Sequence, residues 1–157
     1  MTPDERARRS AHAMWAKDTA SQKMGMRIES VGPGQAVLSM EVMPHHLNGN
    51  GTCHGGFIFT LADSAFAFAC NSYNAVTVGQ ECQITYLTPG QAGERLTATA
   101  IEQAKPGRSG VYDVTVTGED GRKVALMRGL SRTIKGQHFD EHASRDEVVP
   151  SKENNDA

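Results

Sequence analysis

Residues 54–73 read HGGFIFTLADSAFAFACNSY, and this stretch decides how the 157-residue chain folds. It holds a single charged residue, Asp63, and its apolar residues cover every face of a helix. The stretch is too long for a strand, and too short and interrupted to cross a bilayer. Four of the five phenylalanines of the chain lie in it. The sequence therefore predicts a helix that is buried on all sides and forms the centre of the core.

Segments with the two-residue period of β-strands lie on both sides of that helix. We expect two strands before it, at residues 26–31 and 36–42. Four more are expected after it, as a meander, at residues 82–87, 96–100, 112–116 and 123–134.

Residues 24–135 are therefore predicted to form one α+β domain. Because a helix without a polar face must be enclosed, we expect an antiparallel sheet wrapped around the long central helix. In the final strand, Val124, Leu126 and Leu130 are predicted to face the core. A polar amphipathic helix is expected within residues 1–23, and the charge-rich residues 136–157 are predicted to be a disordered tail.

Composition and charge exclude several classes of protein. There are 16 Lys and Arg residues and 18 Asp and Glu residues, which give a net charge of −2 without a basic block, so no nucleic-acid partner is expected. No stretch is long enough to cross a membrane, and the N-terminus lacks the apolar segment of a secretory signal. Three cysteines are an odd number for a disulfide scaffold. We expect a cytoplasmic protein without membrane contact.

Asp63 is the first candidate for chemistry. A carboxylate in an otherwise apolar helix is costly to bury, so it should be paired, protonated or facing a cavity. Gly55 and Gly56, which follow His54 at the start of the same helix, are poor helix formers. A helix start offers free N–H donors and partial positive charge, which suit an oxyanion, although paired glycines also serve in a tight turn.

The spacing of these two features points to a site shared between chains. Asp63 lies eight residues after Gly55, which is ~12 Å along a helix. Groups that far apart cannot act on one carbonyl, because attack requires a distance of ~3–3.5 Å. If both act on one substrate, one of them comes from a second chain, and the site lies between antiparallel copies of this helix.

Other candidates carry weaker signals. Cys53 adjoins His54, but side chains adjacent in sequence seldom face each other, and a packed cysteine is the simpler interpretation. His45, His46 and His54 with Cys53 match no metal-ligand spacing, so no metal is predicted. Lys105-Pro106-Gly107-Arg108-Ser109-Gly110 is a basic turn of the kind that holds phosphates, and solvated hairpin turns share that composition.

The segment LNGNGTCHGGFIFTLADSAFAFACNSYN resembles the central motif of hotdog-fold acyl-CoA thioesterases of the phenylacetate-degradation type, the hydroxyphenylacetyl-CoA thioesterases. The resemblance runs from about Met24 to Ile134 and includes ITYLTPG and VYDVTVTGEDGRKVALMRG. It implies a hotdog fold, hydrolysis of an aryl-acyl-CoA in phenylacetate catabolism, and a homotetramer built as a dimer of dimers. No cofactor is implied, since coenzyme A is part of the substrate.

The resemblance also implies roles for individual residues. Asp63 corresponds to the nucleophile or general base, and Gly55 to the donor of an N–H to the thioester oxygen. Asn48 and His54 correspond to residues that line the same site. The turn from Lys105 to Gly110 corresponds to the contact with the coenzyme A nucleotide.

One departure and two alternatives remain open. Some relatives place a serine where Gly79 aligns, so a hydroxyl that orients water is missing here. A hotdog hydratase or dehydratase would use a histidine and an acid, which His54 and Asp63 imitate. A non-catalytic acyl-CoA sensor would use the same fold without cleaving its ligand.

Overall fold

The computed structural model describes residues 1–143 as four helical segments and six strands. The helical segments are α1 (Pro3–Trp15), α2 (Thr19–Lys23), the 3₁₀ turn η1 (Pro44–His46) and α3 (Gly55–Cys70). The strands are β1 (Met26–Gly32), β2 (Gln35–Glu41), β3 (Thr77–Tyr86), β4 (Arg95–Ala104), β5 (Ser109–Thr117) and β6 (Lys123–Thr133). Among these residues, no helix is long and apolar enough to cross a membrane.

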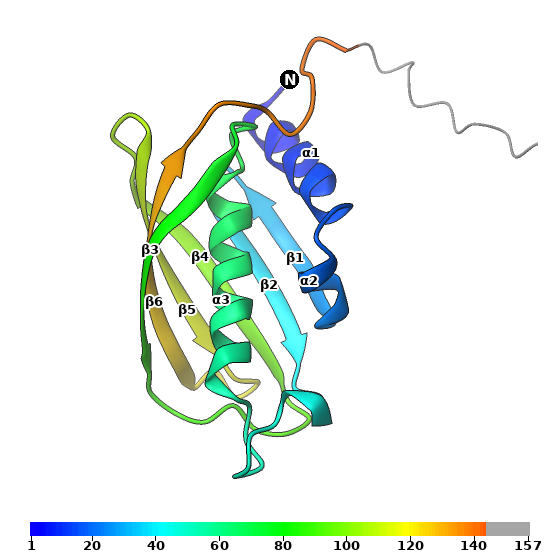
Figure 1. Ribbon diagram of the computed structural model, residues 1–157, viewed down its shortest axis with the longest axis vertical. Coiled ribbons are helices and arrows are strands. Elements are labelled where there is room, and N and C mark those ends of the chain that lie inside the picture. Colours follow the sequence, from blue (N-terminus) through cyan, green and yellow to red (C-terminus); the bar gives the residue numbers. More distant parts are fainter. Residues whose placement is uncertain (144–157) are drawn as a thin grey trace, which may run out of the picture.

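The strands form one antiparallel sheet in the order β1-β2-β4-β5-β6-β3, curved around α3 (Figure 1). The prediction of α+β architecture with a sheet around a central helix is confirmed, and all six expected strands are present. The predicted four-strand meander is wrong. Strand β4 pairs with β2 and β5, so both of its edges are occupied, and β3 pairs instead with the free edge of β6.

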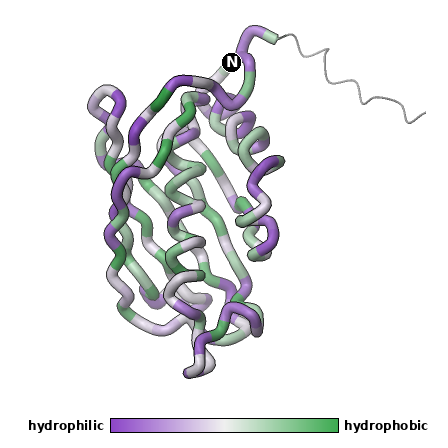
Figure 2. The backbone as a smooth tube through the Cα atoms, in the orientation of Figure 1, coloured by the Kyte–Doolittle hydropathy of each residue, from purple (hydrophilic) through white to green (hydrophobic). Residues whose placement is uncertain are grey.

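The core lies between α3 and the concave face of the sheet, and the hydrophobic colours of Figure 2 run along both. In β6, the predicted inward face is correct for Val124, which is buried, and wrong for Leu126, which is 40% exposed. Ala125 and Met127 are buried instead, and Gly129 on the same face packs against Phe66. A Cβ at Gly129 would lie 2.8 Å from the Phe66 ring.

Helix α3 is not buried on all sides within one chain. Leu61, Phe66 and Phe68 are buried, but Gly56 and Asp63 are exposed on a face that the sheet does not cover. Strand β3, which borders this face, is an edge strand. Helix α3 therefore has an uncovered face beside the unpaired edge of the sheet.

The segments at the two ends of the chain differ in detail from what the sequence predicts. The expected N-terminal helix is two helices, α1 and α2, and Asp18 caps the second by accepting a hydrogen bond from the Ser21 N–H at 2.9 Å. The ordered chain continues past residue 135: the buried Asn74 side chain accepts from the Phe139 N–H at 3.2 Å and donates to the Phe139 carbonyl at 3.0 Å. Residues 144–157 of the predicted tail lie outside the described part of the chain.

Candidate active site

The start of α3 presents an available hydrogen-bond donor. His54 is the N-cap, and its Nδ1 accepts from the Gly56 N–H at 2.9 Å. In the described part of the chain, the N–H of Gly55 makes no hydrogen bond. Because this N–H lies at the positive end of a 16-residue helix, it is suited to bind an oxygen with developing negative charge.

A hollow of about 320 Å³ opens beside this donor. Its walls come from the segment before α3, from α3 and from the end of β3, and are formed by Thr52, Cys53, Gly55, Ile58, Tyr86, Leu87, Thr88 and Pro89. The Tyr86 hydroxyl donates to the Gly55 carbonyl at 2.9 Å. A Cβ at Gly55 would lie 3.1 Å from the Tyr86 ring, so the glycine allows this close approach.

Asp63 lies on the open face of α3 and forms no ion pair with the described residues. The protein atoms around the carboxyl displace water and thereby raise its pKa. The Cys82 thiol contacts this carboxyl, with its Sγ 4.0 Å from Oδ1. Asp63 is thus an accessible carboxylate with few groups to stabilise its charge, as expected of a nucleophile or base.

Within one chain, the structure does not bring all the predicted site residues together. Gly55 and Asp63 are separated by two turns of α3. Asn48 organises the loop before the helix, where its Oδ1 accepts from the Asn50 N–H at 2.9 Å and the Thr52 N–H at 3.2 Å. His54 is engaged as the helix cap.

The basic turn lies between β4 and β5, at the end of the fold opposite the start of α3 (Figure 1). Lys105 places its ammonium 5.0 Å from the centre of the Tyr73 ring, a cation–π contact. The Arg108 carbonyl accepts from the Thr133 N–H at 2.7 Å, which ties the turn to the end of β6. Gly107 adopts φ 65°, so the turn depends on a glycine there.

Comparison with known proteins identifies the family. Residues 50–125 match the sequence profile of the Thioesterase superfamily. Acyl-coenzyme A thioesterase PaaI of Escherichia coli (strain K12) is 44% identical over 131 residues, which are 83% of this chain and 94% of the relative. The chain belongs to the thioesterase superfamily.

Solved structures of thioesterase relatives share the fold. The E. coli PaaI protein from the phenylacetic acid degradation operon matches with a TM-score of 0.85 at 42% identity, over 87% of this chain and 99% of that one. The smu.793 protein of Streptococcus mutans UA159, bound to acetyl CoA, matches with a TM-score of 0.69 at 28% identity, over 71% and 90%. The expected hotdog fold and the resemblance to acyl-CoA thioesterases are confirmed.

Burial shifts the pKa values of two weaker candidates of the sequence, Cys53 and His46, towards their uncharged forms. Burial raises the pKa of the Cys53 thiol to about 11, which leaves it protonated and a poor nucleophile. His46 is buried, and burial lowers the pKa of its imidazole. Among the described residues, no three His, Cys, Asp or Glu side chains gather as metal ligands.

Two features near the candidate site have no local sequence signal. Tyr86 and Cys82 belong to an ordinary strand pattern, yet both contact residues of α3. Glu94 and Arg122 form an ion pair in which Glu94 is buried and Arg122 is partly exposed. Gly79 faces Phe66, and a Cβ there would lie 3.1 Å from the ring.

Proposed function

We propose that the protein hydrolyses aryl-acyl-CoA thioesters, such as phenylacetyl-CoA or hydroxyphenylacetyl-CoA, to the free acid and CoA in phenylacetate catabolism. One observation carries this proposal: within residues 1–143, α3 presents a Gly55 N–H without a hydrogen bond and an Asp63 carboxylate without an ion pair. These are the two groups that thioester hydrolysis requires. The aryl preference is supported by the likeness to E. coli PaaI, which comes from the phenylacetic acid degradation operon.

In the proposed reaction, the thioester carbonyl oxygen accepts the Gly55 N–H, which stabilises the negative charge of the tetrahedral intermediate. The Asp63 carboxylate either attacks the carbonyl carbon or removes a proton from an attacking water. When the intermediate collapses, the carbon–sulfur bond breaks and the CoA thiolate leaves. In the nucleophilic route, water then hydrolyses the acyl-aspartate anhydride.

The site is proposed to form between two chains. Gly55 and Asp63 are ~12 Å apart along one helix, so Asp63 would face Gly55 of the partner subunit across antiparallel α3 helices. The open face of α3 and the unpaired edge of β3, with Val78, Tyr86 and Leu87 at least 43% exposed, support a second copy as the neighbour. The family resemblance extends this dimer to a dimer of dimers.

Antiparallel pairing also gives the basic turn a function. In one chain the turn lies opposite the start of α3, so pairing would bring the turn of one chain towards the helix start of the other (Figure 1). We assign Lys105 and Arg108 to the phosphates of coenzyme A, with the backbone of Pro106, Gly107, Ser109 and Gly110 shaping the turn. The acetyl CoA bound to the S. mutans relative supports CoA as the ligand. No further cofactor is required.

The free thiols of Cys53, Cys70 and Cys82 are consistent with the proposed cytoplasmic location. A hydratase pairing of His54 with Asp63 is less well supported, because the His54 Nδ1 is engaged as the cap of α3 with the Gly56 N–H.

The primary test measures thiol release from a panel of aryl-acyl, short-chain and long-chain acyl-CoAs, with crotonyl-CoA hydration assayed in parallel. We expect cleavage, with the highest kcat/KM on aryl-acetyl substrates. Binding of acyl-CoA without turnover would favour the non-catalytic sensor, and hydration of crotonyl-CoA without thiol release would favour the hydratase.

A double variant tests the basic turn. Replacing both Lys105 and Arg108 by alanine should raise KM for CoA substrates and leave KM for a pantetheine thioester nearly unchanged.

A complementation experiment tests the shared site. Gly55→Pro removes the N–H, and Gly55→Ala is its matched control, because alanine keeps the N–H but brings the same Cβ against Tyr86. Gly55→Pro and Asp63→Asn homodimers should both be inactive. Random re-pairing makes half the dimers hybrids with one whole site each, so about a quarter of wild-type activity should return. Hybrids without activity would place the site within one chain.

A further inference from the structure

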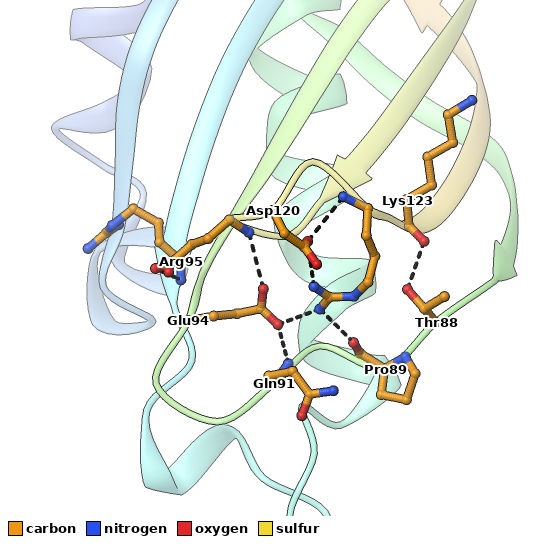
Figure 3. A network of polar contacts seen from close by, with 9 residues as sticks. Thr88, Pro89, Gln91, Glu94, Arg95, Asp120 and Lys123 are labelled. Carbon is orange, nitrogen blue, oxygen red and sulfur yellow. Dashed lines mark hydrogen bonds and ion pairs between the residues drawn. The ribbon is translucent and has the colours of Figure 1, made fainter.

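A buried carboxylate lies at the start of β4, outside the proposed catalytic residues. Glu94 is 9% exposed and is surrounded by donors (Figure 3). Its Oε1 accepts from the Glu119 N–H at 3.2 Å, and its Oε2 accepts from the Gln91 N–H and from the Arg122 guanidinium. Burial alone would raise the pKa of Glu94, but these donors outweigh it and lower the pKa below its ordinary value.

The Arg122 guanidinium extends this network to the segment that joins β3 to β4. Its Nη2 donates to the Pro89 carbonyl at 3.0 Å as well as to Glu94, and its Nη1 donates to Asp120 at 2.7 Å. The pair therefore connects the β5–β6 hairpin to both ends of residues 89–94. Pro89 and residues 91–93 are exposed, so within this segment only Gly90 and Glu94 are held by burial.

On its other side, the same segment supports the backbone that enters α3. The Gly90 carbonyl accepts from the Cys53 N–H at 2.9 Å, and Gln91 forms a β-bridge with Thr52. A Cβ at Gly90 would lie 3.0 Å from the Cβ of Cys53, so the two backbones are in close contact. Cys53 is two residues before Gly55.

We propose that the Glu94–Arg122 pair is a positioning device for the catalytic N–H of Gly55. Arg122 and Glu94 hold residues 89–91 through hydrogen bonds. Residues 89–91 in turn hold the backbone of residues 52–53, which fixes the position of the Gly55 N–H at the start of α3. The inference rests on the proposed function, since it assigns a purpose to the placement of that N–H. Neither Glu94 nor Arg122 lines the hollow beside Gly55, so both act through the backbone.

The test compares steady-state kinetics of the full-length protein on the best acyl-CoA of the panel. Glu94→Gln preserves size and removes the charge, and Arg122→Lys keeps the charge but loses the planar fork that joins Glu94 to Pro89. Because a misplacement of about 1 Å can cost 10²-fold in rate, we expect kcat to fall about 10- to 100-fold. KM should change less than about twofold, since Asp63 and the basic turn are untouched. The double variant should lose no more than either single variant.

The chain offers a second Arg–carboxylate ion pair as a control, and this pair joins β5 to β6. Arg128 on β6 binds Asp113 on β5 through two hydrogen bonds of 2.7 and 2.8 Å. Asp113→Asn should leave kcat unchanged. Hydrogen exchange at the Cys53 amide reports the backbone directly, and it should quicken in Glu94→Gln and Arg122→Lys but not in Asp113→Asn.

Wild-type kcat in a folded Glu94→Gln protein would overturn the inference, as would an equal loss in Asp113→Asn or a loss confined to KM. If Glu94→Gln does not fold, Arg122→Lys decides by the same criteria. A wild-type protein that cleaves no thioester would instead overturn the proposed function, and the exchange of the Cys53 amide would still report whether the pair holds the backbone.

Discussion

Two carboxylates of this protein occupy opposite kinds of surroundings. Glu94 is enclosed and receives donors from two backbone amides and one guanidinium, so its pKa lies below the ordinary value. Asp63 is on an open face of α3, is contacted by the Cys82 thiol, and its pKa lies above the ordinary value. The same functional group is stabilised as an anion in one region and left reactive in the other.

The difference separates a structural carboxylate from one that we propose to be catalytic. A carboxylate that accepts several hydrogen bonds from the protein contributes to stability and is less available to a substrate. A carboxylate without partners weakens folding and retains its basicity. Each prediction below tests one side of this contrast.

The largest effect is expected from Asp63→Asn. Turnover should fall by about 10³-fold or more, because the nucleophile or base is removed while size is retained. Stability should not fall. The folded-state pKa of Asp63 is raised, so above that pKa the ionised carboxylate favours the unfolded state, and asparagine removes this penalty. Thiol-release assays measure turnover, and urea denaturation measures the free energy of unfolding. An Asp63→Asn protein that is both active and less stable than wild type would contradict both expectations.

Glu94→Gln should have the opposite effect on stability. Glu94→Gln removes the buried anion of a hydrogen-bonded pair and leaves Arg122 with Asp120 as its remaining carboxylate partner, so we expect a loss of about 2 kcal/mol in the free energy of unfolding. The exposed pair of Asp113 and Arg128 provides the comparison, and Asp113→Asn should cost less than about 1 kcal/mol. Equal losses of unfolding free energy in Glu94→Gln and Asp113→Asn, measured by urea denaturation, would show that burial of Glu94 adds nothing to the stability that its ion pair provides.

The two carboxylates should also respond differently to acid. In the activity profile, kcat/KM should fall about tenfold per pH unit on an acid limb, and this limb should lie above pH 3.8, the ordinary pKa of aspartate, because the pKa of Asp63 is raised. The lowered pKa of Glu94 means that its stabilisation is complete above pH 4.5 and is lost as pH falls through the folded-state value. The stability advantage of wild type over Glu94→Gln should therefore narrow below pH 4.5. An acid limb at or below pH 3.8 would contradict the first part.

The smallest effect is expected at Cys82. Its thiol is a weak donor 4.0 Å from Asp63, so Cys82→Ser, with a stronger donor, should lower the acid limb by less than about one pH unit. Cys82→Ala should move the limb in the other direction. Shifts of the same sign in both variants would indicate that the thiol acts through packing alone.

Local sequence determined most of the fold because its signals are periodic. The apolar run of residues 54–73 predicts the helix, and alternation predicts the strands, since side-chain direction follows from backbone geometry over a few residues. Asp63 and Gly55 stood out for the same reason, because an apolar helix favours neither a charged residue nor a glycine. Their separation along the helix was also readable, because helix rise is constant.

Only the tertiary structure decided which strand lies beside which. Strand β3 pairs with β6 because β4 is already flanked by β2 and β5, a competition that no segment encodes by itself. The inward face of β6 follows from the position of Phe66, which requires the space at Gly129. Likewise, Glu94 and Arg122 are 28 residues apart and meet because two connecting segments converge at one end of the sheet. Long-range contacts of this kind depend on how the whole chain packs, whereas helices and strands depend on neighbours in sequence.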